Sequence, residues 1–309
     1  MSDSGYELID FGGGYRLERF GDYILERPSL AAADFCKENK LWDKIDSSFL
    51  PESSSEGQRG KWTVTIDSWR MELEQVRVML ELRCTPFGHV GFFAEHVTNW
   101  QELSQTIAEE LKQRDTVRVL NLFAYTGGAS IVAAKSLPTT ITTTTTKNPE
   151  IEIRKRLEVV HVDSANNIVG WAKRNAELNN VSGVRFIAED ARKFVARELR
   201  RGNFYDVVIL DPPTYGHGVR GETWRIAIDL PKLLSDIIGL LSERPIMIIL
   251  TTHTEAFDPD ILSKMLLNAG IPKSLKIKKS QMQIKTKTEK PLPSGYAAIA
   301  SIYNLYRSR

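Results

Sequence analysis

The stretch Asp206-Val-Val-Ile-Leu-Asp-Pro-Pro-Thr-Tyr-Gly216 decides how this chain folds. Its apolar run Val207–Leu210 is typical of a strand buried on both faces of a parallel sheet. The run stops at Asp211, and Pro212 and Pro213 cannot extend a strand ladder because neither has a backbone N–H. A carboxylate therefore stands on a stiff loop at the carboxyl end of a buried strand, where open α/β sheets bind their ligands.

Two interpretations of this loop are open from the stretch alone. A proline-stiffened loop holds an acid and its carbonyls in fixed directions, which suits a site that grips a planar amine or a ring nitrogen. The same residues are equally compatible with a plain exit from a strand. The segments upstream favour the first interpretation.

A second strand followed by a glycine loop lies upstream. Val117–Phe123 predicts a buried strand, Ala124–Ser130 contains Gly127 and Gly128, and an apolar helical segment follows. Glycine lets a backbone approach a ligand closely, and a helix N-terminus offers unpaired N–H donors. The pattern is not the triple-glycine fingerprint of nicotinamide enzymes, and any strand-to-helix turn can contain two glycines.

Two further predicted strands also end in acids. Leu157–Val162 ends at Asp163, which we assign to ribose hydroxyls, although a helix N-cap, which Ser164 could equally supply, is the alternative. The spacing from the glycine loop exceeds the usual ~20 residues, and a threonine-rich insertion over residues 138–150 accounts for the excess. Val184–Ala188 leads to Asp190, which can bind an adenine amino group or cap the next helix.

Basic residues gather in two places. The predicted helix over residues 191–201 carries a stripe that we interpret as a solvated face, with an RNA-facing surface as the alternative: Arg192, Lys193, Arg197, Arg200 and Arg201. Seven lysines against one acid lie in the segment Lys273–Lys290. This C-terminal hairpin is consistent with phosphate contacts, although a lysine-guarded edge strand looks the same.

The C-terminal third continues the α/β pattern. We expect a helix that Asp229 and Pro231 open, and a fifth buried strand at Ile246–Leu250. A helix capped by Asp258 and Pro259 should follow, to about Asn268. The end predicts two long strands, with the turn between them formed by three residues; the strands are Leu275–Thr286 and Tyr296–Tyr306, and the turn residues are Pro291, Pro293 and Gly295.

The first 95 residues differ in character. Arg16–Phe20 and Tyr23–Arg27 flank Gly21-Asp22 and predict a hairpin, and residues 47–60 predict an exposed loop. Residues 61–66 and 76–82 are further strand candidates. We therefore divide the chain into a small β-rich domain, 1–95, and an α/β domain, 96–309. His89 and His96 are interpreted as structural histidines.

Composition limits the function classes. The 309 residues carry a net charge of +2, so the whole-molecule field favours no class of partner. Two cysteines without metal-ligand spacing predict a reducing compartment and no metal site. No segment predicts a membrane span or a targeting peptide, so we expect an intracellular, cytoplasmic protein, with a mitochondrial location left open. A kinase is disfavoured because no lysine-bearing phosphate loop is present.

Taken together, the motifs resemble the S-adenosylmethionine-dependent methyltransferases of the Rossmann-like class, and more closely the bacterial ribosomal RNA large-subunit methyltransferase group. The segments that carry the resemblance are Pro86–Glu95, Asn121–Ser130, Asp163, Asp190, Asp211–Gly218 and Leu292–Gly295, and Leu17–Asp22 is similar to that group's small N-terminal domain. The resemblance implies a mostly parallel seven-stranded sheet that ends in an antiparallel hairpin, beside the β-rich domain.

The resemblance also implies roles for particular residues. Those expected to bind S-adenosylmethionine are Phe92, Glu95, Asn121, Phe123, Tyr125, Thr126, Gly127, Gly128, Asp163, Ser164, Asp190 and Ala191. Those expected to line the junction of cofactor and acceptor, as the catalytic set, are Asp211, Pro212, Pro213 and Tyr215. The expected partner is RNA, in particular ribosomal RNA during its processing, held through Lys273–Lys290.

One departure narrows the chemistry. Cytosine-carbon methyltransferases of the wider group carry a nucleophilic cysteine near the fifth strand, whereas this chain has Thr251-Thr-His-Thr254 there. We therefore expect methylation of a base at nitrogen, whose lone pair attacks the methyl carbon directly. A protein or small-molecule acceptor, and a non-catalytic protein that only binds the cofactor, are the alternatives. The sequence leaves the oligomeric state open.

Overall fold

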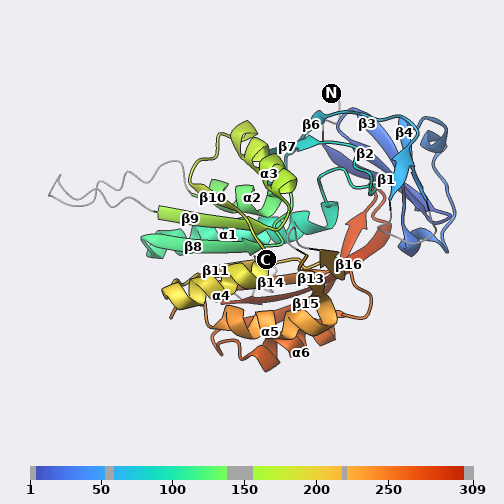
Figure 1. Cartoon of the computed structure of the whole chain (residues 1–309). Coiled ribbons are helices and arrows are strands. Elements are labelled where there is room, and N and C mark those ends of the chain that lie inside the picture. Colours follow the sequence, from blue (N-terminus) through green and yellow to red (C-terminus); the bar gives the residue numbers. More distant parts are fainter. Residues whose placement is uncertain (1–4, 53–58, 138–155, 218–220, 303–309) are drawn as a thin grey trace. The chain divides into compact units, whose positions relative to one another are not determined.

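The computed structural model describes residues 5–52, 59–137, 156–217 and 221–302 (Figure 1). The predicted threonine-rich insertion at 138–150 lies outside these residues. The chain divides into two compact units. The N-terminal unit comprises Met1–Val97 with Met282–Ser294, and the C-terminal unit comprises Thr98–Gln281 with Gly295–Arg309. The sequence-based division at residue 95 placed all later residues in one domain, whereas here the segment Met282–Ser294 groups with the N-terminal strands.

Seven strands of the described chain form one sheet in the order β10-β9-β8-β11-β14-β16-β15. Their bounds are β8 Thr116–Leu122, β9 Arg156–Asp163, β10 Val184–Ala188, β11 Val207–Leu210, β14 Met247–Thr252, β15 Lys276–Lys285 and β16 Pro291–Ser301. The pairs from β10 to β14 are parallel, and β14 pairs with β16 antiparallel. The expected fold class, a mostly parallel sheet with an antiparallel end, is confirmed.

The strand order reverses at one point. From β8 the chain proceeds outward through β9 to β10, and then returns to place β11 and β14 on the other side of β8. At such a switch point the two crossover connections diverge and leave a crevice at the carboxyl ends of the strands. The glycine loop follows β8 and the Asp-Pro-Pro loop follows β11, so both begin at this switch point.

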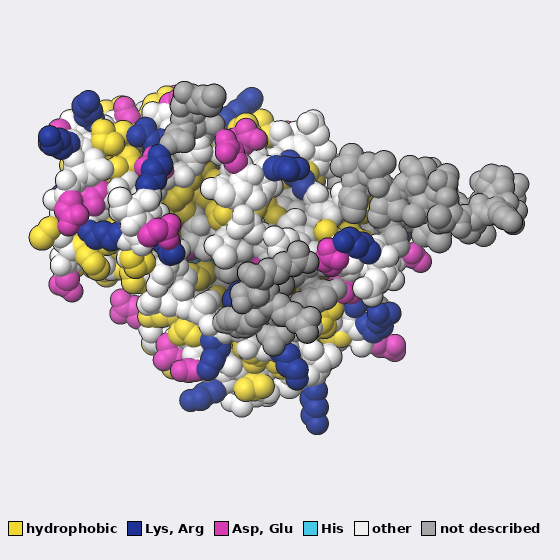
Figure 2. All heavy atoms as spheres, turned by 180° about the vertical axis from the view of Figure 1, so that it is seen from behind, with side chains coloured by type: hydrophobic (Ala, Val, Ile, Leu, Met, Phe, Trp, Pro, Cys, Tyr) yellow, Lys and Arg dark blue, Asp and Glu magenta, His cyan; other side chains and the backbone are white. Residues whose placement is uncertain are grey.

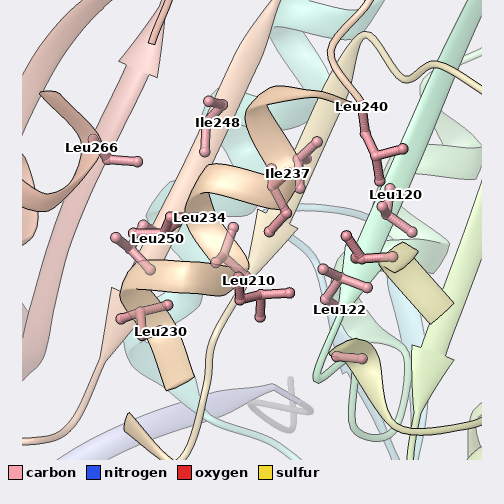
Figure 3. Packing of buried hydrophobic residues seen from close by; sticks show 14 of the residues in the cluster. Leu120, Leu122, Leu210, Leu230, Leu234, Ile237, Leu240, Ile248, Leu250 and Leu266 are labelled. Carbon is pink, nitrogen blue, oxygen red and sulfur yellow. The ribbon is translucent and has the colours of Figure 1, made fainter. Parts of the chain in front are cut away.

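Helices cover both faces of the sheet, with α1, α2 and α3 on one face and α4, α5 and α6 on the other (Figure 1). Their bounds are α1 Val97–Gln113, α2 Gly128–Lys135, α3 Asn166–Leu178, α4 Ala191–Arg201, α5 Ile226–Ile238 and α6 Pro259–Ala269. The central strands supply both cores by alternation: Val207 and Ile209 face one, and Val208 and Leu210 face the other. Figure 3 shows the second core, where leucines of β8, β11 and α5 meet.

Two helix starts illustrate how local sequence sets the elements. Asp258 caps α6 by accepting a hydrogen bond from Ile261 N at 2.8 Å, as predicted. The predicted start of α5 is wrong, because that helix begins at Ile226 and contains Pro231 inside it. Asp229 instead accepts a hydrogen bond from Arg225 N at 2.7 Å and so holds the true N-terminus from within the first turn.

The predicted turn at Pro291, Pro293 and Gly295 is also wrong. These residues belong to β16, and the turn lies at residues 287–288. Prolines are tolerated in strands at positions whose N–H is not needed in the ladder. The described part of the second predicted strand ends at Ser301, so the rest of that prediction falls outside the described residues.

The N-terminal unit contains a five-stranded sheet in the order β1-β2-β3-β4-β5 and a two-stranded β6-β7 sheet within its described residues. The bounds are β1 Tyr6–Gly12, β2 Tyr15–Phe20, β3 Tyr23–Pro28, β4 Ser47–Pro51, β5 Gly60–Trp62, β6 Trp69–Leu73 and β7 Val78–Leu82. The predicted hairpin is confirmed as β2 and β3. The loop predicted at 47–60 is corrected in part, because Ser47 is buried and starts β4. Of the strand candidate 61–66, only the first two residues lie in β5.

The segment from the far end of the sequence completes this unit's core. Ile284 and Leu292 are 6% and 0% exposed and pack with Leu8, Phe11 and Ala32. Residues separated by most of the chain therefore share one apolar cluster.

Among the described residues, no helix is long and apolar enough to cross a membrane.

A buried ion pair joins β2 to β3. The Arg27 guanidinium donates to Glu18 from Nε at 2.7 Å and from Nη2 at 2.9 Å, and both side chains are at most 4% exposed. Burial alone would raise the pKa of Glu18, but Arg16 and Arg27 outweigh it and hold that pKa below its usual range. The third nitrogen of Arg27, Nη1, donates to Gly88 O at 3.1 Å, which ties the Pro86–Glu95 turn to the sheet.

Replacing Arg27 by Met should leave the Glu18 carboxylate buried without its bidentate partner. We expect a loss of about 3 kcal/mol in unfolding free energy, because among the described residues the buried carboxylate then keeps Arg16, at 3.1 Å, and the Tyr6 hydroxyl as its partners. Urea denaturation followed by circular dichroism measures it. Lys285→Met, which removes an exposed pair in the same unit, should cost about 0–1 kcal/mol. Equal losses of unfolding free energy for the two variants would contradict the conclusion that the buried Arg27–Glu18 pair stabilises this unit more than an exposed pair does.

Candidate functional site

The register of three parallel strands brings the predicted acids to one edge. Leu122, the last residue of β8, pairs with Val162 of β9 and with Leu210 of β11. Asp163 and Asp211 each follow one residue later, on the two strands that flank β8. Two strand spacings of about 4.8 Å separate their backbones by roughly 10 Å. Ala188 of β10 pairs with Asp163, so Asp190 lies at the next strand end.

The loop after β8 has an unusual backbone. Phe123 and Tyr125 have φ of 54° and 49°, although neither is glycine, and Gly127 has φ of 91°. Non-glycine residues in this region cost of order 1–3 kcal/mol each and persist where the surroundings hold them. Here Asn175 Nδ2 donates to Thr126 O at 2.9 Å, and Ala124 N donates to Val162 O at 3.1 Å.

Asp163 braces the same loop. Its carboxylate accepts hydrogen bonds from Tyr125 N at 2.9 Å and from Ala165 N at 3.0 Å. Burial raises the pKa of Asp163, and the backbone donors, including that of Ser164, oppose the rise only in part. Ala165 is the N-cap residue of α3, so Asp163 lies before the cap rather than at it.

The two glycines are explained by packing. A Cβ on Gly128 would lie 2.3 Å from Cη2 of Trp100 on α1, and a Cβ on Gly127 would lie 3.1 Å from Cβ of Ala172. The space in front of Gly128 is thus filled by the protein's own indole. The idea that this glycine opens the backbone to a ligand is not needed to explain it, and its contact with the cofactor stays a prediction.

Asp190 is the N-cap of α4, the alternative that the sequence left open. Its carboxylate accepts from Arg192 N at 2.9 Å and from Lys193 N at 3.3 Å, and buried Ala191 is the first helical residue. The Arg192 guanidinium reaches Asp190 and Asp229, each at 2.8 Å. The hydrogen bond to Asp190 raises the pKa of Arg192, and Asp229 adds to the rise. Adenine recognition by Asp190 stays a prediction.

The side chain of Asn121 points into a buried polar network. Its Nδ2 donates to Ser130 Oγ at 2.9 Å, and Ser130 Oγ lies 3.1 Å from His161 Nδ1. Burial lowers the pKa of His161 to about 3, so the ring is neutral. These hydrogen bonds join β8, α2 and β9 beneath the glycine loop. The contact of Asn121 with the cofactor stays a prediction.

The Asp-Pro-Pro loop is held by three hydrogen bonds from neighbouring elements. Thr251 Oγ1 donates to Asp211 Oδ1 at 2.7 Å, and Trp224 Nε1 donates to Pro213 O at 2.7 Å. The hydroxyls of Thr214 and Thr254 lie 2.6 Å apart. Sequence reasoning missed all three supports, because Thr251 and Thr254 were considered only as the place where a cysteine is lacking.

The end of the loop opens toward solvent. Pro212 is buried, Pro213 is exposed, and Tyr215 is 54% exposed. Tyr215 begins the short strand β12 Tyr215–His217, which pairs with β13 Thr223–Arg225. A large aromatic ring that is exposed beside a rigid, acid-bearing loop can stack on a planar group.

Phe92 and Glu95 lie in the N-terminal unit. Phe92 is 2% exposed and its ring centroid is 5.5 Å from that of Tyr6. Glu95 is 5% exposed and accepts from Ser294 Oγ at 2.9 Å. Two motifs that the sequence singled out, Pro86–Glu95 and Leu292–Gly295, thus meet through one hydrogen bond. The roles of Phe92 and Glu95 over the cofactor stay predictions.

Most basic residues of the two predicted stripes are matched by acids. In the C-terminal segment, Lys278 contacts Glu102, Lys279 contacts Asp260, Lys285 contacts Glu289, Lys287 contacts Glu7 and Lys290 contacts Glu38. On α4, Lys193 contacts Glu222, Arg197 contacts Glu189 and Arg201 contacts Glu198. This fits the solvated-face interpretation of α4. On the face shown in Figure 2, lysines and arginines lie among aspartates and glutamates over much of the surface.

In the part of the chain that the structure describes, no group of three or more His, Cys, Asp or Glu side chains could hold a metal ion. The prediction that no metal takes part is not tested by this finding. The described residues at these strand ends offer carboxylates, carbonyls, hydroxyls and aromatic rings.

Comparison with known proteins defines the class. A solved S-adenosylmethionine-dependent methyltransferase from Agrobacterium tumefaciens superposes with a TM-score of 0.82 at 28% identity, over 98% of this chain and 92% of that one. A Streptococcus mutans structure described as such a methyltransferase superposes with a TM-score of 0.68 at 14% identity, over 97% and 76%, which supports the fold alone. The fold is that of the Rossmann-like S-adenosylmethionine-dependent methyltransferases.

Sequence relatives carry a more particular name. The chain is 28% identical over 211 residues to "Ribosomal RNA large subunit methyltransferase K/L" of Shewanella frigidimarina, covering 67% of this chain and 25% of the relative. It is 30% identical over 173 residues to the same-named protein of Pseudoalteromonas atlantica, covering 55% and 21%. The chain thus spans about a quarter of the length of these relatives. No family model matches it. The resemblance expected from the sequence is confirmed.

Adding a methyl group at Gly128 should test its packing role. Gly128→Ala should lower the unfolding free energy by about 1–3 kcal/mol, because the new Cβ collides with the Trp100 indole. Trp100→Leu in the same chain should recover part of the loss. Thermal unfolding measures both variants.

Gly170→Ala is the matched control, because a Cβ there meets only the Arg174 side chain, at 3.9 Å. It should leave stability unchanged or raise it by up to about 1 kcal/mol, since alanine favours a helix interior. If Gly128→Ala behaved like this control, the packing explanation would be refuted.

Proposed function

We propose that this chain is an S-adenosylmethionine-dependent methyltransferase that methylates a base of RNA, in particular ribosomal RNA, at nitrogen. The observation that carries the proposal is the register at the switch point. It sets the strained, braced loop after β8 between Asp163 of β9 and Asp211 of β11. A nucleoside cofactor and an acceptor need binding groups that are adjacent but distinct, as the carboxylates on the two sides of this loop are.

The residues at the strand ends fit S-adenosylmethionine. Asp163 is a partly exposed carboxylate with the acceptor capacity that ribose hydroxyls need, and the loop Tyr125–Gly128 is the expected contact for the methionine part. Asp190 is next along the edge, where the adenine is expected. When bound, S-adenosylmethionine supplies an electrophilic methyl group on its sulfonium.

The loop after β11 fits an acceptor amine. Thr251 donates to Oδ1 of Asp211 and so helps to fix the direction of the carboxylate, which has the acceptor capacity to take a hydrogen bond from a base nitrogen. Tyr215 can stack on an unpaired base, a contact worth about 1–3 kcal/mol. Methyl transfer to nitrogen needs orientation above all, and orientation can contribute up to about 7–11 kcal/mol.

Nitrogen is favoured over carbon because the described chain lacks the needed nucleophile at this edge. Cys36 and Cys84 both belong to the N-terminal unit, and the end of β14 carries threonines instead. Thr251 and the neighbouring Thr254 are engaged in holding the Asp-Pro-Pro loop. An acceptor that supplies its own lone pair needs no covalent help from the protein.

RNA as the acceptor is supported by the names of the sequence relatives. The hairpin lysines would contribute through exposed pairs such as Lys279–Asp260 and Lys285–Glu289, which contribute little energy and can open for a phosphate. The same pairing of lysines with acids favours the second candidate function, methylation of a protein or small molecule. An intracellular, cytoplasmic location belongs to the proposal as well.

The proposal is tested with S-adenosylmethionine labelled in its methyl group. We expect calorimetry to show binding and the label to appear in total RNA, in a base rather than in ribose. Label in protein or in small molecules would instead support the second candidate function, methylation of a protein or small molecule. Binding without transfer to any of these would refute an enzymatic function.

Asp211→Ala should abolish turnover and spare cofactor binding. We expect kcat to fall at least about 100-fold, because the acceptor nitrogen loses its orienting group. The dissociation constant of S-adenosylmethionine should stay within about threefold, since Asp211 lies on the acceptor loop. Asp236→Ala, which removes the exposed Lys232–Asp236 pair on α5, is the control and should retain wild-type activity. Full activity of Asp211→Ala would refute the assigned role.

Cofactor affinity should depend on pH through Asp163. Burial raises the pKa of this carboxyl, so it gains a proton at a higher pH than an ordinary aspartate and then accepts fewer hydrogen bonds. Affinity should therefore weaken as the pH falls through that raised pKa. Asp163→Asn should weaken binding at neutral pH by about 1.5–3 kcal/mol and remove this pH dependence. Calorimetric titrations at several pH values measure both effects, and an unchanged profile in the variant would contradict the role.

A further inference from the structure

Trp224 is a buried tryptophan that no motif singled out. It is 5% exposed, lies in β13 opposite Gly216 of β12, and packs into the core beneath α5. A buried indole N–H needs an acceptor, and here the acceptor is the carbonyl of Pro213, at 2.7 Å. The indole therefore fixes the peptide plane between Pro213 and Thr214, immediately after the acid of the acceptor loop.

The same ring touches the other half of the site. Its centroid lies 4.8 Å from that of Phe123, with an interplanar angle of 57°. Phe123 is the first residue after β8 and has a φ of 54°, so its side chain helps to hold a backbone that would otherwise relax. One side chain thus joins the cofactor loop to the acceptor loop.

A third strand end is connected through Arg192. Its guanidinium carbon lies 5.8 Å from the Trp224 ring centroid, and its Nη1 donates to Thr223 O at 3.0 Å. The same guanidinium binds Asp190 at the start of α4 and Asp229 at the start of α5. These contacts clamp the β12-β13 hairpin between two helices, so the indole has little freedom to move.

We propose that Trp224 is a positioning residue that sets the geometry between the cofactor loop and the acceptor loop, a role that rests on the proposed methyltransferase function. It touches neither reactant. Its indole N–H orients the Pro213 carbonyl, and its ring holds Phe123. Because a displacement of about 1 Å can cost a hundredfold in rate, a group that fixes two loops relative to each other controls turnover without binding substrate.

The test compares two matched substitutions. Trp224→Phe keeps a ring against Phe123 and removes the N–H. Trp69→Phe is the control, because Trp69 is 9% exposed and donates its indole N–H to Phe20 O at 3.0 Å in the N-terminal unit. Both variants lose one buried indole hydrogen bond to a carbonyl and should lose similar thermal stability. We expect Trp224→Phe alone to lower kcat for methyl transfer, by about 10- to 100-fold, with the cofactor dissociation constant within threefold.

Two kinetic results would overturn the proposal. Equal kcat values in Trp224→Phe and Trp69→Phe would show that the indole hydrogen bond is merely structural. Loss of cofactor binding in Trp224→Phe would place Trp224 in the cofactor pocket instead.

A readout without turnover separates this proposal from the proposed function. Hydrogen exchange should accelerate at least tenfold at Thr214–Gly216 in Trp224→Phe and stay unchanged in β11 and α5, with no change there in Trp69→Phe. If wild-type protein methylates nothing, the proposed function fails, and the exchange rates still decide whether Trp224 orders the acceptor loop. Unchanged exchange at Thr214–Gly216 would refute the proposal whatever the acceptor.

Discussion

The parallel pairing of β8 with β9 on one side and β11 on the other is the constraint on which the site depends. Leu122 is in register with Val162 and with Leu210, so three strands stop at the same level. A shift of one residue in either pair would reverse which core each side chain faces. Because both faces are filled, the cores that stabilise the sheet also fix the level at which Asp163 and Asp211 emerge.

The two loops at that edge of the sheet are held in place by hydrogen bonds from neighbouring strands and helices. The glycine loop has strained residues that are held by the carboxylate of Asp163 and by Asn175 of α3. The Asp-Pro-Pro loop has few conformations to begin with and is held by Thr251 and Trp224. The proposed reaction, methyl transfer, is chiefly a matter of orientation, so it would benefit from loops whose ordering is complete before ligands arrive.

Local pattern sufficed for much of this fold. The buried strands at 207–210 and 246–250 were predictable because apolar residues on both faces leave a continuous run. β1 was missed because it has a bulge between Leu8 and Asp10, which breaks the alternation of side chains. Its Asp10 is buried and is satisfied by Trp42 Nε1 at 2.7 Å, a contact that no local pattern contains.

The candidate site likewise has some features that local sequence predicts and others that depend on contacts between distant segments. The acids at the strand ends followed from strand boundaries, which are local. The packing of Trp100 on Gly128 and the hydrogen bond from Trp224 to Pro213 depend on how distant segments pack, so no local pattern predicts either. Gly128 shows most clearly the risk of inferring a ligand contact from a sequence pattern. Its pattern suggests an open approach to a ligand, but the Trp100 indole covers this glycine.

The completion of the N-terminal core by Ile284 and Leu292 has a consequence for synthesis on the ribosome. Residues 1–97 emerge before the segment 282–294 that finishes their core, which follows about 185 residues later. At translation rates of about 5–20 residues per second, the segment 1–97, once made, waits roughly 10–40 s for the partners of Leu8, Phe11 and Ala32. During that interval the nascent β unit is incomplete and exposes apolar surface, which is the condition under which chaperones bind emerging chains.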